Sequence, residues 1–260
     1  MIGGQIGAYG RGWHDPGRYV WSPFVIKLEA RLRFANIPYK TASGSVKTAP
    51  KGKVPYTEIT DPSNENPSST GSDTTSIGDS SLIIKHLVER NILPDLNGDV
   101  YPPQRAHDLA LRALLEDKAY FYNKTTTPCA IPYAVRIVVG LLIYRSTVQT
   151  LQGQGTGRYS AEEIRGFRVE AWEAVNDLLV ALKAKTQSGD APFWVLGGEE
   201  PTEADTTVFG FVVSALICDA GPKTRELVNE FPVITEYARR IHDAYFPDYE
   251  RWLSRLTDWL

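Results

Sequence analysis

Hydrophobic and polar positions are spaced differently in the two parts of this 260-residue chain. In the first part, stretches that alternate as strands do, such as residues 53–59, lie between stretches with helical spacing. Helices are predicted from Pro23 to about Asn36 and over residues 81–89. Residues 60–76 carry almost no apolar side chains, and we expect them to form a solvated loop. This order of elements predicts a small α/β domain.

The second part of the chain shows helical spacing and no strand pattern. Helices are predicted over residues 104–122, 131–150, 161–185, 204–218 and 233–244. Between the two parts, Asn, Gly and Pro gather in a stretch that is typical of a linker. We therefore expect an α/β domain over residues 1–93, a linker over residues 94–103 and an all-helical domain over residues 104–260.

The charge and composition of the chain exclude several classes of function. The formal net charge of −3 argues against nonspecific binding to nucleic acid or to an anionic membrane. The apolar runs fall short of the roughly 20 residues that a membrane span needs, and the N-terminus lacks the features of a signal peptide. We therefore expect a cytoplasmic protein. Cys129 and Cys218 lie in apolar runs, and we expect them to be buried free thiols. The histidines show no metal-ligand spacing, so the sequence predicts neither a disulfide nor a metal site.

The most informative local pattern is Trp21-Ser22-Pro23-Phe24, in which a hydroxyl residue immediately precedes the proline that begins a helix. Proline suits the first helical turn because its missing N–H would have no partner there. Ser22 therefore lies where unpaired backbone N–H groups and the positive end of the helix dipole converge. An anion, including a thiolate, can be held at such a place. A simple N-cap, which contributes about 1 kcal/mol, is the alternative role for Ser22.

Two further patterns in the α/β domain have the same character. Val54-Pro55 begins a strand at an X-Pro bond. If that bond is cis, the backbone of Val54 could pair with an extended peptide ligand. Asp79-Ser80 precedes the second helix, whose N-terminal N–H groups could bind a carboxylate. A simple helix cap is the alternative for this second pair.

The order of these motifs along the chain resembles the glutathione transferase superfamily. The segments that carry the resemblance are Ser22-Pro23-Phe24, Gly52-Lys53-Val54-Pro55 and Gly78-Asp79-Ser80-Ser81-Leu82-Ile83-Ile84. The first and the last of them most resemble the branch that contains the failed axon connections and metaxin proteins. In the second part of the chain, Pro201-Thr202-Glu203-Ala204-Asp205 resembles the buried capping box of the superfamily's C-terminal domain. Thr202 is a good N-cap residue, and Asp205 three positions later can reach back to its N–H.

The resemblance implies both a fold and a ligand. It implies a thioredoxin-like N-terminal domain that binds glutathione, followed by a helical glutathione transferase C-terminal domain that shapes a pocket for a small hydrophobic electrophile. Glutathione is then the expected co-substrate, and a homodimer is the usual assembly. Relatives with cysteine at the position of Ser22 tend toward thiol–disulfide chemistry, whereas a serine cannot form a mixed disulfide. Ser22 therefore favours activation of glutathione for addition, substitution or isomerisation.

The resemblance also assigns roles to individual residues. Asp79 and Ser80 would hold the γ-glutamyl end of glutathione. Val54, before a cis Pro55, would pair with the cysteinyl backbone. Lys53 would face the glycyl carboxylate, and a solvated surface lysine is the alternative for it. These assignments place the whole peptide-binding surface on the α/β domain.

The hydroxyl that contacts the glutathione sulfur has two candidates. Ser22 would donate a hydrogen bond to the sulfur, and a helix N-terminus with such a donor lowers the pKa of a thiol from about 8.5. Tyr9 is the alternative activating hydroxyl, because some transferase classes place a tyrosine at the end of the first strand. Trp21, Tyr120 and Tyr122 would line the substrate pocket, and core packing is the alternative for the two tyrosines.

Three functions are compatible with these assignments. The first is a glutathione transferase that activates the glutathione thiol for attack on a small hydrophobic electrophile. The second is a glutathione-dependent cis–trans isomerase of an unsaturated metabolite, in which reversible thiolate addition permits rotation and no net glutathione is consumed. The third is a non-catalytic, metaxin-like binding or adaptor protein that keeps the fold.

Overall fold

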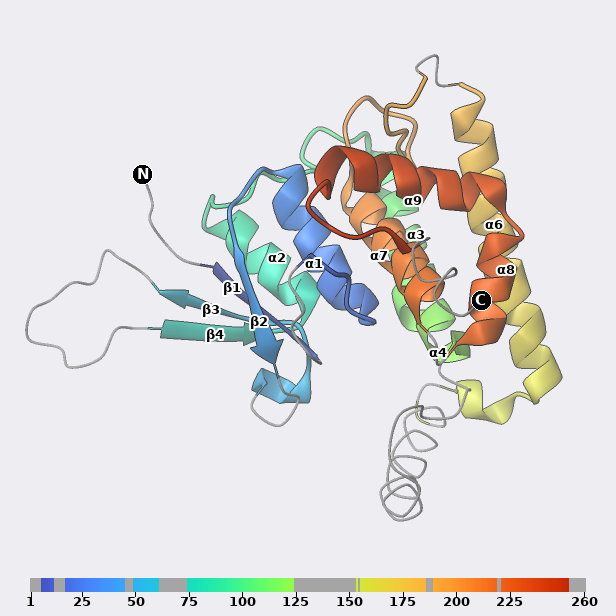
Figure 1. Ribbon diagram of the computed structural model, residues 1–260, viewed down its shortest axis with the longest axis horizontal. Coiled ribbons are helices and arrows are strands. Elements are labelled where there is room, and N and C mark those ends of the chain that lie inside the picture. Colours follow the sequence, from blue (N-terminus) through green and yellow to red (C-terminus); the bar gives the residue numbers. More distant parts are fainter. Residues whose placement is uncertain are drawn as a thin grey trace, which may run out of the picture.

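The computed structural model describes residues 6–11, 17–44, 49–60, 74–123, 153, 155–185, 189–218 and 221–252. These residues form two packed bodies, a small sheet with two helices on it and a larger group of helices (Figure 1). The order of elements is the expected one, because strands and helices alternate first and helices alone follow within the described residues.

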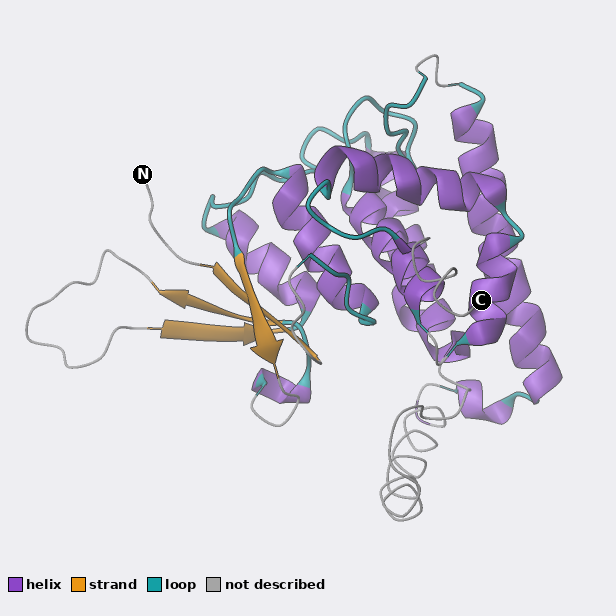
Figure 2. Cartoon of the chain, in the orientation of Figure 1, coloured by secondary structure: helices purple, strands orange, loops and turns teal. Residues whose placement is uncertain are grey.

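The sheet has four strands in the order β2-β1-β3-β4 (Figure 2). They are β1 (Ile6–Arg11), β2 (Lys40–Gly44), β3 (Tyr56–Thr60) and β4 (Thr74–Gly78). β1 pairs in parallel with β2 and antiparallel with β3, and β3 pairs antiparallel with β4. The parallel pair needs a crossover connection, which α1 provides.

The prediction of a solvated loop over residues 60–76 is wrong at both ends, where the chain forms strands. Thr60 closes β3 and Thr74 opens β4, and these two residues are paired with each other. β4 is an edge strand, so it does not need apolar side chains on both faces. Because it begins Thr-Thr-Ser, the spacing of apolar residues does not indicate a strand there. The rest of the predicted loop, residues 61–73, lies outside the described residues.

Two helices pack on one face of the sheet, α1 (Pro23–Phe34) and α2 (Ser80–Glu89). They share a small apolar core with β3, formed by Leu28, Leu32, Ile59, Ile83, Ile84, Leu87 and Leu93. Figure 1 shows α1 between the sheet and the C-terminal helices. Its apolar positions therefore face the sheet and the C-terminal part at once, and its residues from Val25 to Leu32 are all buried.

The C-terminal part contains helices and no strand among its described residues. Its elements are α3 (Pro102–Ala113), the π-helical turn η3 (Leu114–Ala119), α4 (Tyr120–Asn123), η4 (Thr156–Arg158), α6 (Ala161–Lys183), α7 (Glu203–Ile217), α8 (Pro222–Asn229) and α9 (Pro232–Tyr245). The helices predicted over residues 104–122, 161–185, 204–218 and 233–244 are confirmed, with ends that differ by one or two residues. The prediction over residues 131–150 and Cys129 lie outside the described residues. The short helix α8 was not predicted.

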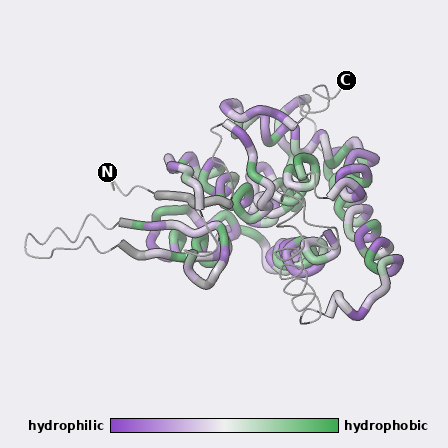
Figure 3. Tube along the Cα trace, turned by 60° about the horizontal axis from the view of Figure 1, so that its bottom comes forward, coloured by the Kyte–Doolittle hydropathy of each residue, from purple (hydrophilic) through white to green (hydrophobic). Residues whose placement is uncertain are grey.

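Helix α7 forms the centre of the molecule. Figure 3 shows hydrophobic and hydrophilic positions alternating along most helices, as expected for helices with one buried side. α7 differs because nearly all of its residues are buried. At Gly210 it lies directly against α1, since a Cβ there would be 2.6 Å from the carbonyl oxygen of Pro23. Cys218, predicted to be buried, is a partly exposed free thiol at the end of α7.

None of the described helices is by itself long and apolar enough to cross a membrane. Taken together, α7 and α8 reach that length and apolarity, but their axes are bent by 115° and α7 is the buried central helix.

Candidate functional site

Ser22 lies at the start of α1, as the sequence predicts. Its backbone is extended, with φ −79° and ψ 115°, and its carbonyl oxygen accepts hydrogen bonds from the N–H groups of Val25 and Ile26. Its side chain makes no capping hydrogen bond to the helix. A simple capping role therefore does not account for the hydroxyl, which remains available at the positive end of the α1 dipole.

The segment before Ser22 is held by the C-terminal part of the chain. Trp21, which is 48% exposed, accepts a hydrogen bond at its carbonyl oxygen from Ser214 Oγ at 2.6 Å. Tyr19 is buried, and its hydroxyl shares a hydrogen bond of 2.7 Å with His242 Nδ1. These two anchors come from α7 and α9, so the placement of Ser22 depends on both domains.

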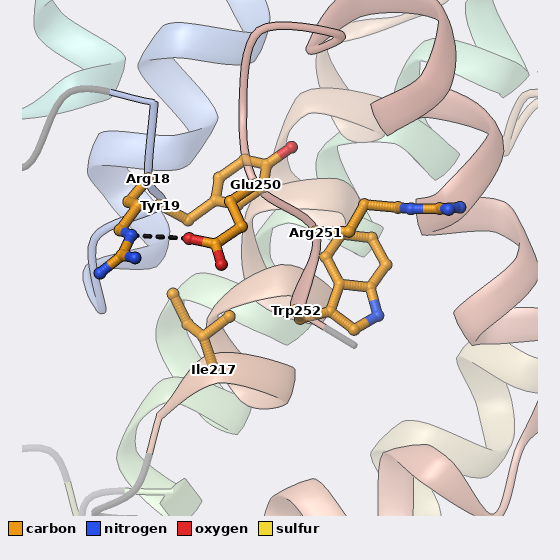
Figure 4. Close-up of a pocket in the computed structure, with 6 residues that line it drawn as sticks. All are labelled: Arg18, Tyr19, Ile217, Glu250, Arg251 and Trp252. Atoms are coloured by element: carbon orange, nitrogen blue, oxygen red, sulfur yellow. Dashed lines mark ion pairs between the residues drawn. The ribbon is translucent and has the colours of Figure 1, made fainter. Parts of the chain in front are cut away.

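A small cavity lies beside this anchor (Figure 4). It is lined by Arg18, Tyr19, Ile217, Glu250, Arg251 and Trp252. Arg18 Nε and Glu250 Oε2 form an ion pair of 2.6 Å across it. Its volume of about 10 Å³ is close to the space that one water molecule occupies. The cavity is therefore part of the anchor and too small to be a substrate pocket.

The Val54–Pro55 peptide bond, whose geometry the sequence leaves open, is cis. It follows the short 3-10 helix η1 (Pro50–Gly52) and precedes β3. The carbonyl oxygen of Pro55 accepts a hydrogen bond of 3.0 Å from the N–H of Asp79. Two of the predicted glutathione-binding segments, one before β3 and one before α2, are therefore directly joined.

Asp79 is the N-cap residue of α2, and its carboxylate accepts a hydrogen bond of 3.1 Å from the N–H of Ser81. Its φ of 85° lies in a region that non-glycine residues rarely adopt, and such backbone strain clusters at functional sites. Ser80, the first residue of the helix, is buried. The prediction that Asp79 caps the helix is confirmed. A cap does not by itself require the positive φ of this residue.

Lys53 contacts Asp79, with 2.9 Å between its Nζ and Oδ2 of the carboxylate. Burial acts to raise the pKa of Asp79, but the hydrogen bond and charge of Lys53 and the N–H of Ser81 outweigh it, so the pKa lies below the ordinary value. Asp79 is therefore ionised at neutral pH. Lys53 itself is 62% exposed, and its contact with a glycyl carboxylate stays a prediction.

Lys27 is a residue of this site that sequence reasoning missed. Lys27 is one of the most deeply buried side chains, only 1% exposed, and its Nζ donates to Ser81 Oγ at 2.9 Å and to Glu116 Oε1 at 2.7 Å. Glu116 also accepts a hydrogen bond of 2.8 Å from Thr207 Oγ1. The only signal along the sequence is a charged residue between the apolar Ile26 and Leu28, and a solvated lysine gives the same signal.

The predicted pocket residues fall into two groups. Tyr120 packs edge-to-face against Phe24 with ring centroids 5.0 Å apart, and Phe24 packs against Phe211 at 5.7 Å. This aromatic trio therefore lies beside the first turn of α1, two residues after Ser22. Tyr122 instead stacks on Phe167 of α6 at 5.7 Å. The structure thus associates Tyr120, and not Tyr122, with the start of α1.

Tyr9 lies in the inner strand β1, paired with Ala42 of β2 and Tyr56 of β3. Its side chain lies outside what the structure describes.

The sequence of the chain is similar to those of known proteins. Residues 23–127 match the family described as glutathione S-transferase N-terminal domain. The chain is 30% identical over 179 residues to an isoprene-epoxide glutathione S-transferase from Rhodococcus sp. (strain AD45). The matched region covers 61% of this chain and 69% of that protein.

Two solved structures resemble the fold over nearly the whole chain. Glutathione transferase Omega 2S from Trametes versicolor has 17% sequence identity and a TM-score of 0.52, over 98% of this chain and 95% of the other. Maleylacetoacetate isomerase from Anaeromyxobacter dehalogenans 2CP-1, a structure with bound glutathione, has 13% identity and a TM-score of 0.52, over 96% of each chain. They confirm the predicted fold class, a thioredoxin-like domain followed by a helical domain. The chain belongs to the glutathione transferase superfamily.

Proposed function

We propose that this protein binds glutathione and uses Ser22 to hold its sulfur as a thiolate that attacks a small hydrophobic electrophile. The observation that carries the proposal is the Ser22 hydroxyl, which lies at the start of α1 and does not cap it. The proposed glutathione-binding residues are Lys53, Val54, Pro55, Asp79 and Ser80.

Each end of glutathione has a matching group on the α/β domain. The ionised carboxylate of Asp79 suits the γ-glutamyl ammonium, because a charge-assisted hydrogen bond is stronger than a neutral one. The N-terminus of α2, where Ser80 lies, suits the γ-glutamyl carboxylate. The main chain of Val54 would pair with the extended cysteinyl backbone, as peptide ligands pair with exposed strand edges. Such pairing directs the sulfur toward the start of α1.

The chemical step follows from the thiolate. An unperturbed thiol has a pKa of about 8.5, and a helix N-terminus with a hydrogen-bond donor lowers it. The thiolate sulfur then attacks an electrophilic carbon and forms a C–S bond. If the electrophile is an epoxide, the C–O bond breaks, its electron pair stays on oxygen, and the alkoxide takes a proton from water. Ser22 keeps its own proton throughout and acts by donating a hydrogen bond.

The class of electrophile is supported by two observations. The Rhodococcus relative is named for an isoprene epoxide, which is a small apolar electrophile. Beside Ser22, the partly buried rings of Phe24 and Tyr120 pack together, with the buried ring of Phe211 behind Phe24. We therefore propose a small unsaturated or aromatic epoxide as the first substrate to test, with Trp21 and Tyr120 bordering the pocket and Tyr122 outside it.

The proposal is tested by the ultraviolet absorbance of the thiolate when glutathione is added over a range of pH. The native protein should show the thiolate well below the pH at which free glutathione ionises. Ser22→Ala should keep its affinity for glutathione and raise that pH, whereas Tyr9→Phe should leave it unchanged. An unchanged titration in Ser22→Ala would assign the role to Tyr9 or to backbone N–H groups.

The alternatives are separated by the fate of glutathione. Consumption of one glutathione for each electrophile identifies a transferase. Turnover of an unsaturated substrate without glutathione consumption identifies a cis–trans isomerase, which the same thiolate chemistry permits. Absence of glutathione binding at millimolar concentration would leave a non-catalytic, metaxin-like binding protein.

A further inference from the structure

Lys27 is an unusual residue because its charge is enclosed by the protein. Only 1% of it is exposed, yet a buried ammonium is costly unless it is paired and hydrogen-bonded. Its two partners come from different domains, Ser81 from α2 and Glu116 from the π-helical turn η3. The position therefore links the sheet-covering helices to the C-terminal helices.

The partners of Lys27 continue the link in both directions. Ser81 donates its N–H to the carboxylate of Asp79, which in turn pairs with Lys53. On the other side, Glu116 Oε1 accepts the hydroxyl of Thr207 in the central helix α7. A continuous chain of hydrogen bonds thus runs from the buried centre of the molecule to the carboxylate at the start of α2.

The helix that supplies Glu116 also contacts the start of α1. Glu116 lies in a π-helical turn, an irregularity that occurs frequently at functional sites. Four residues later, Tyr120 packs its ring against Phe24 in the first turn of α1. One helical segment therefore contacts α1 near Ser22 through Tyr120 and at Lys27 through Glu116.

We propose that Lys27 is a positioning residue for the γ-glutamyl end of glutathione. It fixes the first turn of α2, through Ser81, against the C-terminal domain, so that Asp79 and the N–H groups of α2 face the ligand in a preformed arrangement. Preformed binding groups raise affinity because less ordering accompanies binding. This inference rests on the proposed function, since it concerns the same ligand.

Arg31 provides a matched control in the same helix. It lies one turn after Lys27, is fully buried, and also pairs with the C-terminal part through Glu203 at 2.6 Å and the carbonyl oxygen of Pro94. None of these contacts involves Asp79 or Ser81. Replacement of Arg31 therefore reports what the loss of a buried interdomain ion pair does by itself.

The test compares Lys27→Met, Ser81→Ala and Arg31→Met for glutathione dissociation constant by calorimetry and for unfolding free energy by chemical denaturation. Ser81→Ala keeps the Lys27–Glu116 ion pair and removes only the link to α2, so it stays informative if Lys27→Met does not fold. We expect Lys27→Met and Ser81→Ala to weaken glutathione binding by about tenfold each, and by about the same factor together, because they break one interaction.

Arg31→Met should lose stability while its affinity for glutathione stays within about twofold of the native value. The inference is overturned if Ser81→Ala binds glutathione as tightly as the native protein, or if Arg31→Met weakens binding as much as Lys27→Met. If the native protein binds no glutathione at millimolar concentration, the proposed function fails and this inference fails with it. Native binding with an unaffected Ser81→Ala removes only the role of Lys27.

Discussion

Asp79 and Asp205 have similar structural roles, but one is partly exposed and the other is buried. Each lies at the start of a helix and accepts hydrogen bonds from nearby backbone N–H groups, Asp79 at α2 and Asp205 at α7. Asp205 is completely buried and accepts from Thr202, Val195 and Tyr237. Asp79 is partly exposed and pairs with a lysine. The buried aspartate is enclosed together with its donors, whereas the partly exposed one, although it contacts Lys53 and Ser81, keeps its charge at the surface where a ligand can meet it.

The difference extends to the direction in which the two pKa values move. Burial raises the pKa of Asp205 from 3.8 to about 6, although hydrogen bonds from Thr202, Val195 and Tyr237 oppose the rise. For Asp79 the same burial effect is outweighed by Lys53, and the pKa falls. A structural aspartate and a candidate binding aspartate can therefore be told apart by their partners, neutral donors in one case and a cation in the other.

The largest effect is expected from Asp205→Ala. The substitution leaves the N–H groups of Thr202 and Val195 and the hydroxyl of Thr202 without their acceptor in a buried place. Each unpaired buried group costs about 1–3 kcal/mol, so we expect a loss of about 4 kcal/mol in unfolding free energy, measured by chemical denaturation. If Asp205→Ala cost less than Asp79→Ala, the comparison would be reversed.

The next effect is a pH dependence of opposite sign at the two sites. A raised pKa means that the folded state holds a proton more tightly, so the contribution of Asp205 to stability is present below pH 3.8 and is lost as the pH rises through about 6. The native protein should therefore lose on the order of 3 kcal/mol relative to Asp205→Asn over this window.

Asp79 should show the reverse. Its lowered pKa gives a contribution that is present above pH 3.8 and is lost as the pH falls below it. Denaturation curves of native protein, Asp205→Asn and Asp79→Asn between pH 3 and pH 8 (about the ordinary range of carboxylate titration and above) check both signs. Equal slopes for the two variants would contradict the assignment.

A smaller effect is expected at the contact between the central helix α7 and the start of α1. Gly210 of α7 lies against the start of α1, where a Cβ would meet the carbonyl oxygen of Pro23 at 2.6 Å and the nitrogen of Lys27 at 3.0 Å. Gly210→Ala should force the helices apart, cost about 2 kcal/mol and weaken glutathione binding. Gly166→Ala in α6 is the matched control, because no atom lies within 4 Å of its added Cβ. It should leave binding unchanged and stabilise the protein by about 0.5–1 kcal/mol.

The smallest effect on stability, and a clear effect on binding, are expected from Asp79→Ala. Loss of one cap should cost about 1 kcal/mol. Loss of the charged partner of the γ-glutamyl ammonium should weaken glutathione binding by about tenfold or more. Calorimetry on the folded variant measures this. Native affinity in Asp79→Ala would remove the binding role and leave only a cap.

The sequence predicts these two sites to different extents. The Thr202–Asp205 box is confirmed, because a capping box needs only residues three positions apart. The start of α1 at Pro23 and the cap at Asp79 are local in the same sense. The role of Ser22 toward a ligand remains a prediction.

What the sequence does not predict depends on contacts between distant segments. Lys27 can be buried because Ser81 and Glu116 supply acceptors from elements far along the chain. The separation of Tyr120 from Tyr122 follows from the packing of Phe24 and Phe167. β4 was not predicted because its pairing with β3, and not the spacing of apolar residues, makes it a strand.

The central claim is that the start of α1 and the start of α2 together bind glutathione as a thiolate. Calorimetric titration of the protein with glutathione at neutral pH, repeated in buffers of different ionisation enthalpy, measures both the affinity and the number of protons released. We expect binding with release of the thiol proton in the native protein, and binding with a smaller release in Ser22→Ala. Absence of binding at millimolar glutathione, or binding without proton release, would contradict it.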